Sequence, residues 1–175
     1  MKAVKKQLSA GLGKNEIFEK ASVDGLNLKK VSKYLAMFPD SDESLKYNKA
    51  NNILIGIYSI LVIIGLLGSA SMFSSIPPAG LVAVLLFALL IPAAVIYSIY
   101  KKQSIGYLIL CFFLFKGILD SFKGYEAEPT SVLIGVSINA ALIIFIVILK
   151  NKLFPHQNFF NTKKDNDGFS VYTKI

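Results

Sequence analysis

Long stretches without a charged side chain constrain this chain more than any other feature. Three of them, at residues 53–73, 79–99 and 130–149, run for about twenty residues. A helix rises 1.5 Å per residue, so each would measure ~30 Å, the thickness of the hydrocarbon core of a bilayer. A fourth stretch, 105–122, carries two charges, but leaving it outside the membrane would place a cluster of phenylalanines in water. We therefore predict four membrane-spanning helices.

The connections between these stretches are short, which makes consecutive helices antiparallel neighbours. Strands of an outer-membrane barrel have ~10 residues with alternating polarity, a pattern that is not visible here. The predicted fold class is therefore all-α: an integral membrane four-helix bundle with an amphipathic cytoplasmic helix before it. We divide the chain into a basic N-terminal tail (1–50), a transmembrane domain (51–150) and a flexible C-terminal tail (151–175).

The lysines predict the orientation of the bundle, because cytoplasmic loops of membrane proteins are enriched in basic residues. All 19 basic residues are lysine. Three pairs flank the spans on one side: Lys46 and Lys49, Lys101 and Lys102, Lys150 and Lys152. Three tyrosines are expected at the interface on that same side: Tyr97, Tyr100 and Tyr107. We expect a multi-pass protein of a bacterial cytoplasmic (inner) membrane with both termini in the cytoplasm; the polar first fifty residues lack the apolar core of a cleavable signal peptide.

An amphipathic basic helix is predicted over residues 26–38. Its apolar residues recur at helical spacing, and lysines occupy the flanks: Leu28, Val31, Leu35 and Phe38, with Lys29, Lys30 and Lys33. Such a helix can lie on an anionic leaflet of the lipid bilayer. Packing against the protein itself and docking of a partner are the alternatives. The net charge of +8 follows from the lysine-rich flanks, and without a reading helix or an aromatic platform we expect no nucleic-acid partner.

Polar residues inside the spans are the main candidates for a functional site. Lys116 and Asp120 are four residues apart, so they share a helix face and can pair. Asn139 lies at a similar depth on the last span. One interpretation is that the three residues hold the bundle together. The other is an ion or proton site near the outer face, with Glu126 and Glu128 attracting cations.

Small residues predict where the helices approach one another closely. Gly65 and Ser69 form one pair at a spacing of four residues, and Ser131 and Gly135 form a second that continues to Asn139. Such stripes let helix backbones come together in lipid. We expect the third and fourth spans to pack through the second stripe, which would bring Asn139 near Lys116.

Catalysis finds little support in the sequence. The chain has one histidine and one cysteine, so it cannot build a histidine or cysteine metal cluster, and it has no glycine-rich phosphate loop. His156 is expected to be a solvated residue of the C-terminal tail. We therefore predict a protein that is not an enzyme and that needs no metal or cofactor.

In size and topology, over the four spans, the chain is similar to the small four-helix immunity proteins that bacteria keep against membrane-active toxins, and to accessory subunits of inner-membrane assemblies. That resemblance implies a protein that binds another membrane protein through its helices. The alternative hypothesis is a small transporter or channel, formed as a homo-oligomer, whose path contains Lys116, Asp120 and Asn139.

Overall fold

The computed structural model describes residues 2–69, 76–124, 128–158 and 161–172, and this part of the chain is mainly helical. The chain divides into two compact units. We call Asn48–Ile146 the membrane unit, and we call Met1–Tyr47 together with Val147–Ile175 the terminal unit.

Four long apolar helices belong to the membrane unit: α5 (Asn48–Gly68), α7 (Pro78–Tyr100), α8 (Ser104–Ser121) and α9 (Pro129–Leu153), whose last residues lie in the terminal unit. Each is long and apolar enough to cross a membrane, which fits a multi-pass membrane protein and confirms the predicted fold class. The first span begins five residues before its predicted start, and its predicted residues 70–73 lie outside the described residues.

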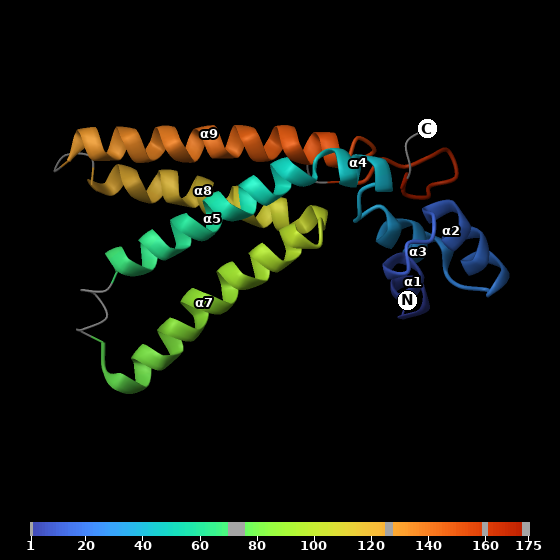
Figure 1. Ribbon diagram of the computed structural model, residues 1–175, viewed down its shortest axis with the longest axis horizontal. Coiled ribbons are helices and arrows are strands. Elements are labelled where there is room, and N and C mark those ends of the chain that lie inside the picture. The colour runs from blue at the N-terminus through green and yellow to red at the C-terminus, as the bar shows by residue number, and fades with distance from the viewer. Residues whose placement is uncertain (1, 70–75, 125–127, 159–160, 173–175) are drawn as a thin grey trace. The chain divides into compact units, whose positions relative to one another are not determined.

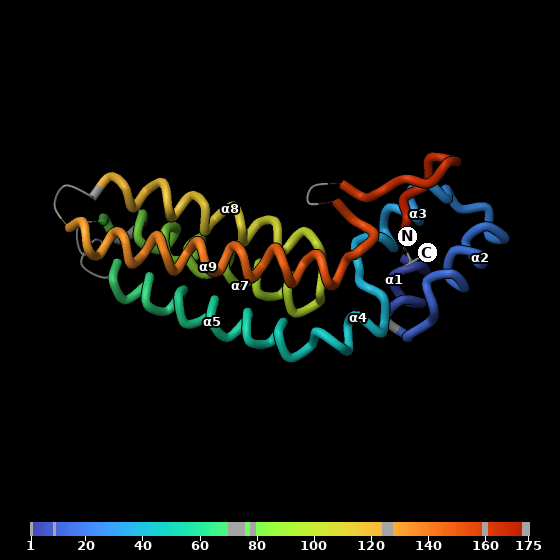
Figure 2. The backbone as a smooth tube through the Cα atoms, turned by 90° about the horizontal axis from the view of Figure 1, so that it is seen from above, coloured from blue at the N-terminus to red at the C-terminus, as the bar shows by residue number. Residues whose placement is uncertain are grey.

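The membrane helices pack most closely at one end of the unit. Both views place α8 beside α9 (Figures 1 and 2). Near its C-terminal end α7 meets α5 and α8, and it diverges from α5 toward its N-terminal end (Figure 1). Accordingly, Val95 and Ile99 are buried in α7, whereas Val82, Leu86 and most of its other residues before position 95 are exposed.

A tight turn joins α7 to α8. Lys102 adopts a left-handed conformation with φ 51°, and the turn closes with a hydrogen bond of 2.9 Å from the Gln103 amide to the Ser98 carbonyl. A Cβ atom at Gly106 would lie 2.8 Å from the Ser98 Cβ and 3.0 Å from the Ile99 nitrogen. Only glycine therefore lets the first turn of α8 approach α7 this closely.

The terminal unit combines the two ends of the chain. Its N-terminal part holds α1 (Lys2–Ser9), α2 (Lys14–Val23), α3 (Leu28–Leu35) and α4 (Ser41–Lys46). The C-terminal segment runs along α3 (Figure 2), and the Ser170 amide donates a hydrogen bond of 3.2 Å to the Ser32 hydroxyl. The core is formed by five apolar residues of α1, α2 and α3: Val4, Ile17, Ala21, Val31 and Leu35.

Candidate functional site in and beside the membrane helices

The charged pair predicted on the third span forms on α8. The Lys116 ammonium donates a hydrogen bond to the Asp120 carboxylate, and Lys123 in the short helix η1 (Phe122–Gly124) donates a second one of 2.6 Å. The side chains of Lys116 and Asp120 are 61% and 42% exposed. All three residues belong to one continuous segment, so these ion pairs do not tie α8 to another membrane helix.

Asn139 lies where α9 comes close to α8. A Cβ atom at Gly117 would be 3.7 Å from the Asn139 amide nitrogen, which places Asn139 beside the residue that follows Lys116. Among the described residues, however, no hydrogen bond joins Asn139 to Lys116 or Asp120. Asn139 thus lies near the pair in space but does not bond to it.

The two glycines of the predicted small-residue stripes have no close neighbour on another helix among the described residues. No described residue comes within 4 Å of a Cβ atom built at Gly65 or Gly135, and Ser131 is exposed. The Ser69 hydroxyl donates to the Gly65 carbonyl within the same helix, at 2.8 Å. Asn139, which continues the second stripe, lies beside Gly117 of α8, whereas Gly135 has no such neighbour. Packing of the two helices through Ser131 and Gly135 stays a prediction.

A polar contact that we did not predict lies inside the membrane unit. Asn51 in α5 donates a hydrogen bond of 3.2 Å to the Ile99 carbonyl of α7, and its own carbonyl accepts one from the Tyr107 hydroxyl of α8. Asn51 and Tyr107 are buried. Tyr107 therefore contacts the protein, whereas Tyr97 and Tyr100 are exposed. The position of the three tyrosines at a membrane interface stays a prediction. One asparagine joins three helices here.

The apolar face of α3 is covered by the terminal unit itself. Val31 and Leu35 are fully buried, Leu28 packs against the same cluster, and Phe38 is half-buried just after the helix. The Tyr34 and Phe38 rings lie 5.4 Å apart. Three lysines of the predicted helix remain exposed: Lys29, Lys30 and Lys33. In this arrangement Val31 and Leu35 contact the protein rather than lipid, while the exposed lysines still offer a basic surface.

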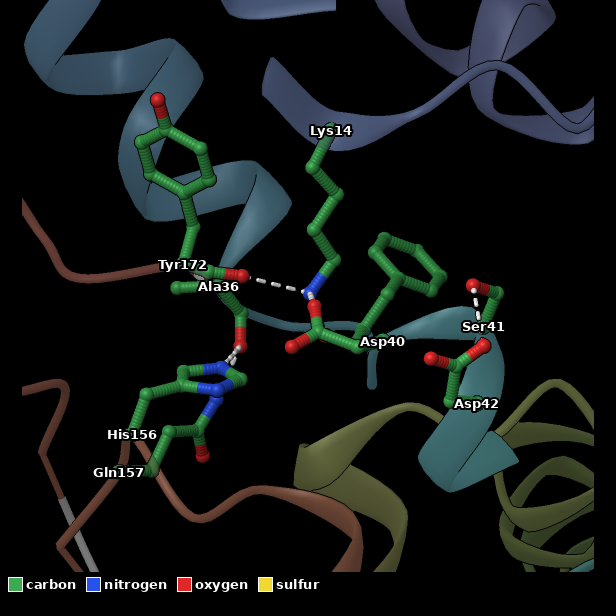
Figure 3. A network of polar contacts seen from close by, with 9 residues as sticks. Lys14, Ala36, Asp40, Ser41, Asp42, His156, Gln157 and Tyr172 are labelled. Atoms are coloured by element: carbon green, nitrogen blue, oxygen red, sulfur yellow. Dashed lines mark hydrogen bonds and ion pairs between the residues drawn. The ribbon is translucent and has the colours of Figure 1, made fainter. Parts of the chain in front are cut away.

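Lys14 is the centre of the polar network that joins the two ends of the chain (Figure 3). Its buried ammonium donates hydrogen bonds to the Phe38 carbonyl at 2.6 Å and the Tyr172 carbonyl at 2.7 Å, and it lies 2.9 Å from an Asp40 carboxylate oxygen. Burial lowers the pKa of Lys14, and the Asp40 carboxylate opposes that change. The three acceptors satisfy all three donors of the ammonium.

His156 is buried, so the expectation of a solvated tail residue is wrong. Only 4% of the residue is exposed, and its Nε2 lies 3.3 Å from the Ala36 carbonyl, which also accepts a hydrogen bond from Gln157 (Figure 3). The described residues supply no partner for its Nδ1. Burial lowers the pKa of His156, and the positive charge of Lys14 adds to that effect. The neutral imidazole is therefore the form that fits this position.

The terminal unit also limits the topology of the chain. Because Lys14 binds Tyr172 and His156 binds Ala36, the segments before α5 and after α9 share one side of any membrane that the helices cross. This arrangement requires an even number of crossings. Four crossings satisfy it and three would not, which is consistent with α8 as a candidate span despite Lys116 and Asp120.

In the described part of the chain, no three histidine, cysteine, aspartate or glutamate side chains come together as a metal site would require. Of the two acidic residues predicted to attract cations, Glu128 is exposed and Glu126 lies outside the described residues.

Comparison with protein-family models, curated proteins and solved structures finds no match.

Proposed function

We propose that this protein works in a bacterial cytoplasmic membrane, without catalysis of its own, by binding another membrane protein through its helices. Accessory, assembly and toxin-immunity proteins act in this way. The lysine-rich flanks and the terminal unit they adjoin are proposed to lie in the cytoplasm. The observation that carries the proposal is the charged pair Lys116 and Asp120 on the exposed side of α8.

The depth of this pair favours a protein neighbour. Lys116 lies six residues inward from Phe122, or about 9 Å at helical rise, where a charged side chain is unfavourable in lipid. The lysine can extend toward the interface, which reduces that penalty. A polar group on a neighbouring protein helix would reduce it further and would also give the contact specificity.

The surface around the pair supports the same interpretation. Exposed residues recur along α8 at helical spacing and form one outward stripe: Ile105, Ile109, Phe112, Lys116 and Leu119. A mainly apolar stripe with one ion pair resembles the contact surfaces of membrane helices, which combine close packing with a few polar contacts.

Photo-crosslinking in native membranes tests this proposal. A photoreactive phenylalanine analogue at Phe112, which is 65% exposed, is expected to capture one defined membrane protein. The same analogue at Phe113, which is half-buried, is the matched control and should react within the chain. Capture of lipid alone at Phe112 would contradict the proposal.

A small oligomeric transporter or channel is the second candidate. The charged pair favours an oligomeric transporter because both side chains are exposed on the outside of one chain. A transport path that contains Lys116 and Asp120 would therefore have to form between protomers. Solute or ion flux in proteoliposomes that disappears with Lys116→Leu would support this candidate. A Lys116→Leu protein that inserts normally, keeps its flux and loses its partner would support the first.

A further inference from the structure

An open groove lies between α7 and α8 in the membrane unit. It has a volume of about 300 Å³, and its lining is apolar except for one serine: Phe87, Leu90, Ile91, Ala94, Val95, Ser98 and Ile109. That volume is at the lower end for small-molecule sites. A helix with its side chains is 10–12 Å across, so the groove is too small to seat a partner helix.

The groove has the length of one lipid leaflet. Phe87, Ile91, Ala94 and Ser98 follow one face of α7 at helical spacing. The eleven steps along the helix from Phe87 to Ser98 span about 16 Å, which is close to half of the ~30 Å hydrocarbon core. An extended acyl chain of one leaflet covers that depth.

Positive charge gathers at one end of the groove. Lys101 continues the same face of α7 one turn beyond Ser98, and Lys102 follows it. The Lys101 ammonium is exposed and lies 5.8 Å from the centre of the Tyr97 ring and 5.5 Å from that of the Tyr100 ring. The two rings hold the charge where a lipid headgroup would lie.

We propose that this groove binds an anionic phospholipid, with an acyl chain along α7 and the phosphate at the Lys101 ammonium. The site is apolar for the depth of one leaflet and positive at one end, and a lipid with an anionic headgroup has the complementary polarity. The lysine end of the groove lies on the side proposed as cytoplasmic, where the leaflet is rich in anionic lipid. Ile109 also belongs to the outward stripe of α8, so the groove borders the surface proposed for the protein partner.

Native mass spectrometry of the full-length protein tests the proposal. The protein, in a mild non-ionic detergent, is titrated with phosphatidylglycerol and, separately, with phosphatidylcholine that has the same acyl chains. Phosphatidylglycerol should bind more tightly than phosphatidylcholine. Lys101→Gln should weaken phosphatidylglycerol binding by about five-fold, the change expected for one lysine near an anionic headgroup. It should weaken phosphatidylcholine binding less, because the choline cation offsets the charge of the phosphate in that lipid.

Two adjacent alanines of α7 provide a matched pair for the acyl chain. Ala94 lines the groove and Ala93 does not, and both are exposed. Ala94→Phe should reduce the binding of both lipids, whereas Ala93→Phe should leave it unchanged. Ala94→Leu is the substitute if the phenylalanine variant does not fold. Equal binding of the two lipids by the unmodified protein, or equal effects of the two alanine substitutions, would overturn the proposal.

Discussion

At the scale of single residues, the membrane unit depends on a polar contact that joins three helices. Asn51 binds the Ile99 carbonyl and receives a hydrogen bond from Tyr107, and the asparagine and the tyrosine are buried. A buried polar group that loses its partner costs about 1–3 kcal/mol, more than the hydrogen bond itself contributes in net terms.

Tyr107→Phe should therefore destabilise the membrane unit by about 1–3 kcal/mol, because the substitution leaves the Asn51 carbonyl without that donor. Thermal melting of the purified protein in a mild detergent measures the change as a lower midpoint. Tyr100→Phe is the control, since Tyr100 is exposed near the same end of α7. Equal melting of the two variants would show that the contact does not stabilise the fold.

His156 makes the stability of the terminal unit depend on pH. Its pKa in the folded state lies below the ordinary value of 6.5, so the unfolded chain binds a proton at a higher pH than the folded one. Stability from this residue is complete above about pH 6.5 and decreases as the pH falls below it. Limited proteolysis from pH 7.5 to pH 5 should show increasing cleavage of the C-terminal segment, and His156→Gln should weaken that dependence. If the cleavage of His156→Gln depended on pH as strongly as that of the unmodified protein, the pH dependence would have to come from other titratable groups.

The sequence predicts the contacts of some of these residues and not of others. Lys116 and Asp120 are conspicuous because charges are rare in an apolar stretch, and the structure pairs them as the spacing predicts. Asn51 lies before the predicted start of the first span, and nothing in its neighbourhood distinguishes it from a solvated residue. Lys14 and His156 each bind a segment more than a hundred residues away in sequence, which leaves no local signal of these contacts.

At the scale of helices, the spans are predictable because a charge-free run of about twenty residues usually crosses a bilayer as an α-helix, which satisfies its own backbone hydrogen bonds. Close approach between helices is less predictable. Gly65 and Gly135 have the spacing of a packing stripe but face open space, whereas Gly106, which belongs to no stripe, permits the tightest glycine contact among the described residues. The sequence spacing of small residues identifies helix surfaces that allow close packing. The turn between α7 and α8 determines that the close contact forms at Gly106.

Gly106→Ala should destabilise the membrane unit by about 1–3 kcal/mol, because the added Cβ meets the backbone and side chain of α7 and forces the helices apart. Gly135→Ala should be neutral or slightly stabilising in the isolated protein, since it adds a methyl group in open space and favours the helix. Chemical denaturation in mixed micelles compares the two variants. A larger loss for Gly135→Ala would contradict this packing.

At the scale of the whole chain, the terminal unit is the least predictable feature. Its core combines short helices from the first forty residues, and Tyr172 packs against the Phe18 ring at 5.0 Å between ring centres. The C-terminal segment shows no regular period, so the sequence alone predicts a flexible tail. Hydrogen bonds within the segment and contacts with the other end of the chain order it together.

Lys14→Ala should release the C-terminal segment, because it removes one side chain that binds Phe38, Asp40 and Tyr172 together. Breaking a buried ion pair by removing one partner costs about 3 kcal/mol. Hydrogen exchange of the full-length protein should show faster exchange in the C-terminal segment. Lys20→Ala is the control, since Lys20 lies on the same helix in an exposed pair with Glu16 and should change stability little. Slow exchange in both variants would contradict the role of Lys14.

We propose that this protein, with its four candidate membrane spans, works by binding another membrane protein through α8. The most direct test is a purification from native membranes in mild detergent, followed by mass measurement of the intact complex. We expect a second protein at fixed stoichiometry, and we expect it to be lost when Lys116 and Asp120 are replaced together by leucine. A homo-oligomer or a monomer with no other protein attached would contradict the claim.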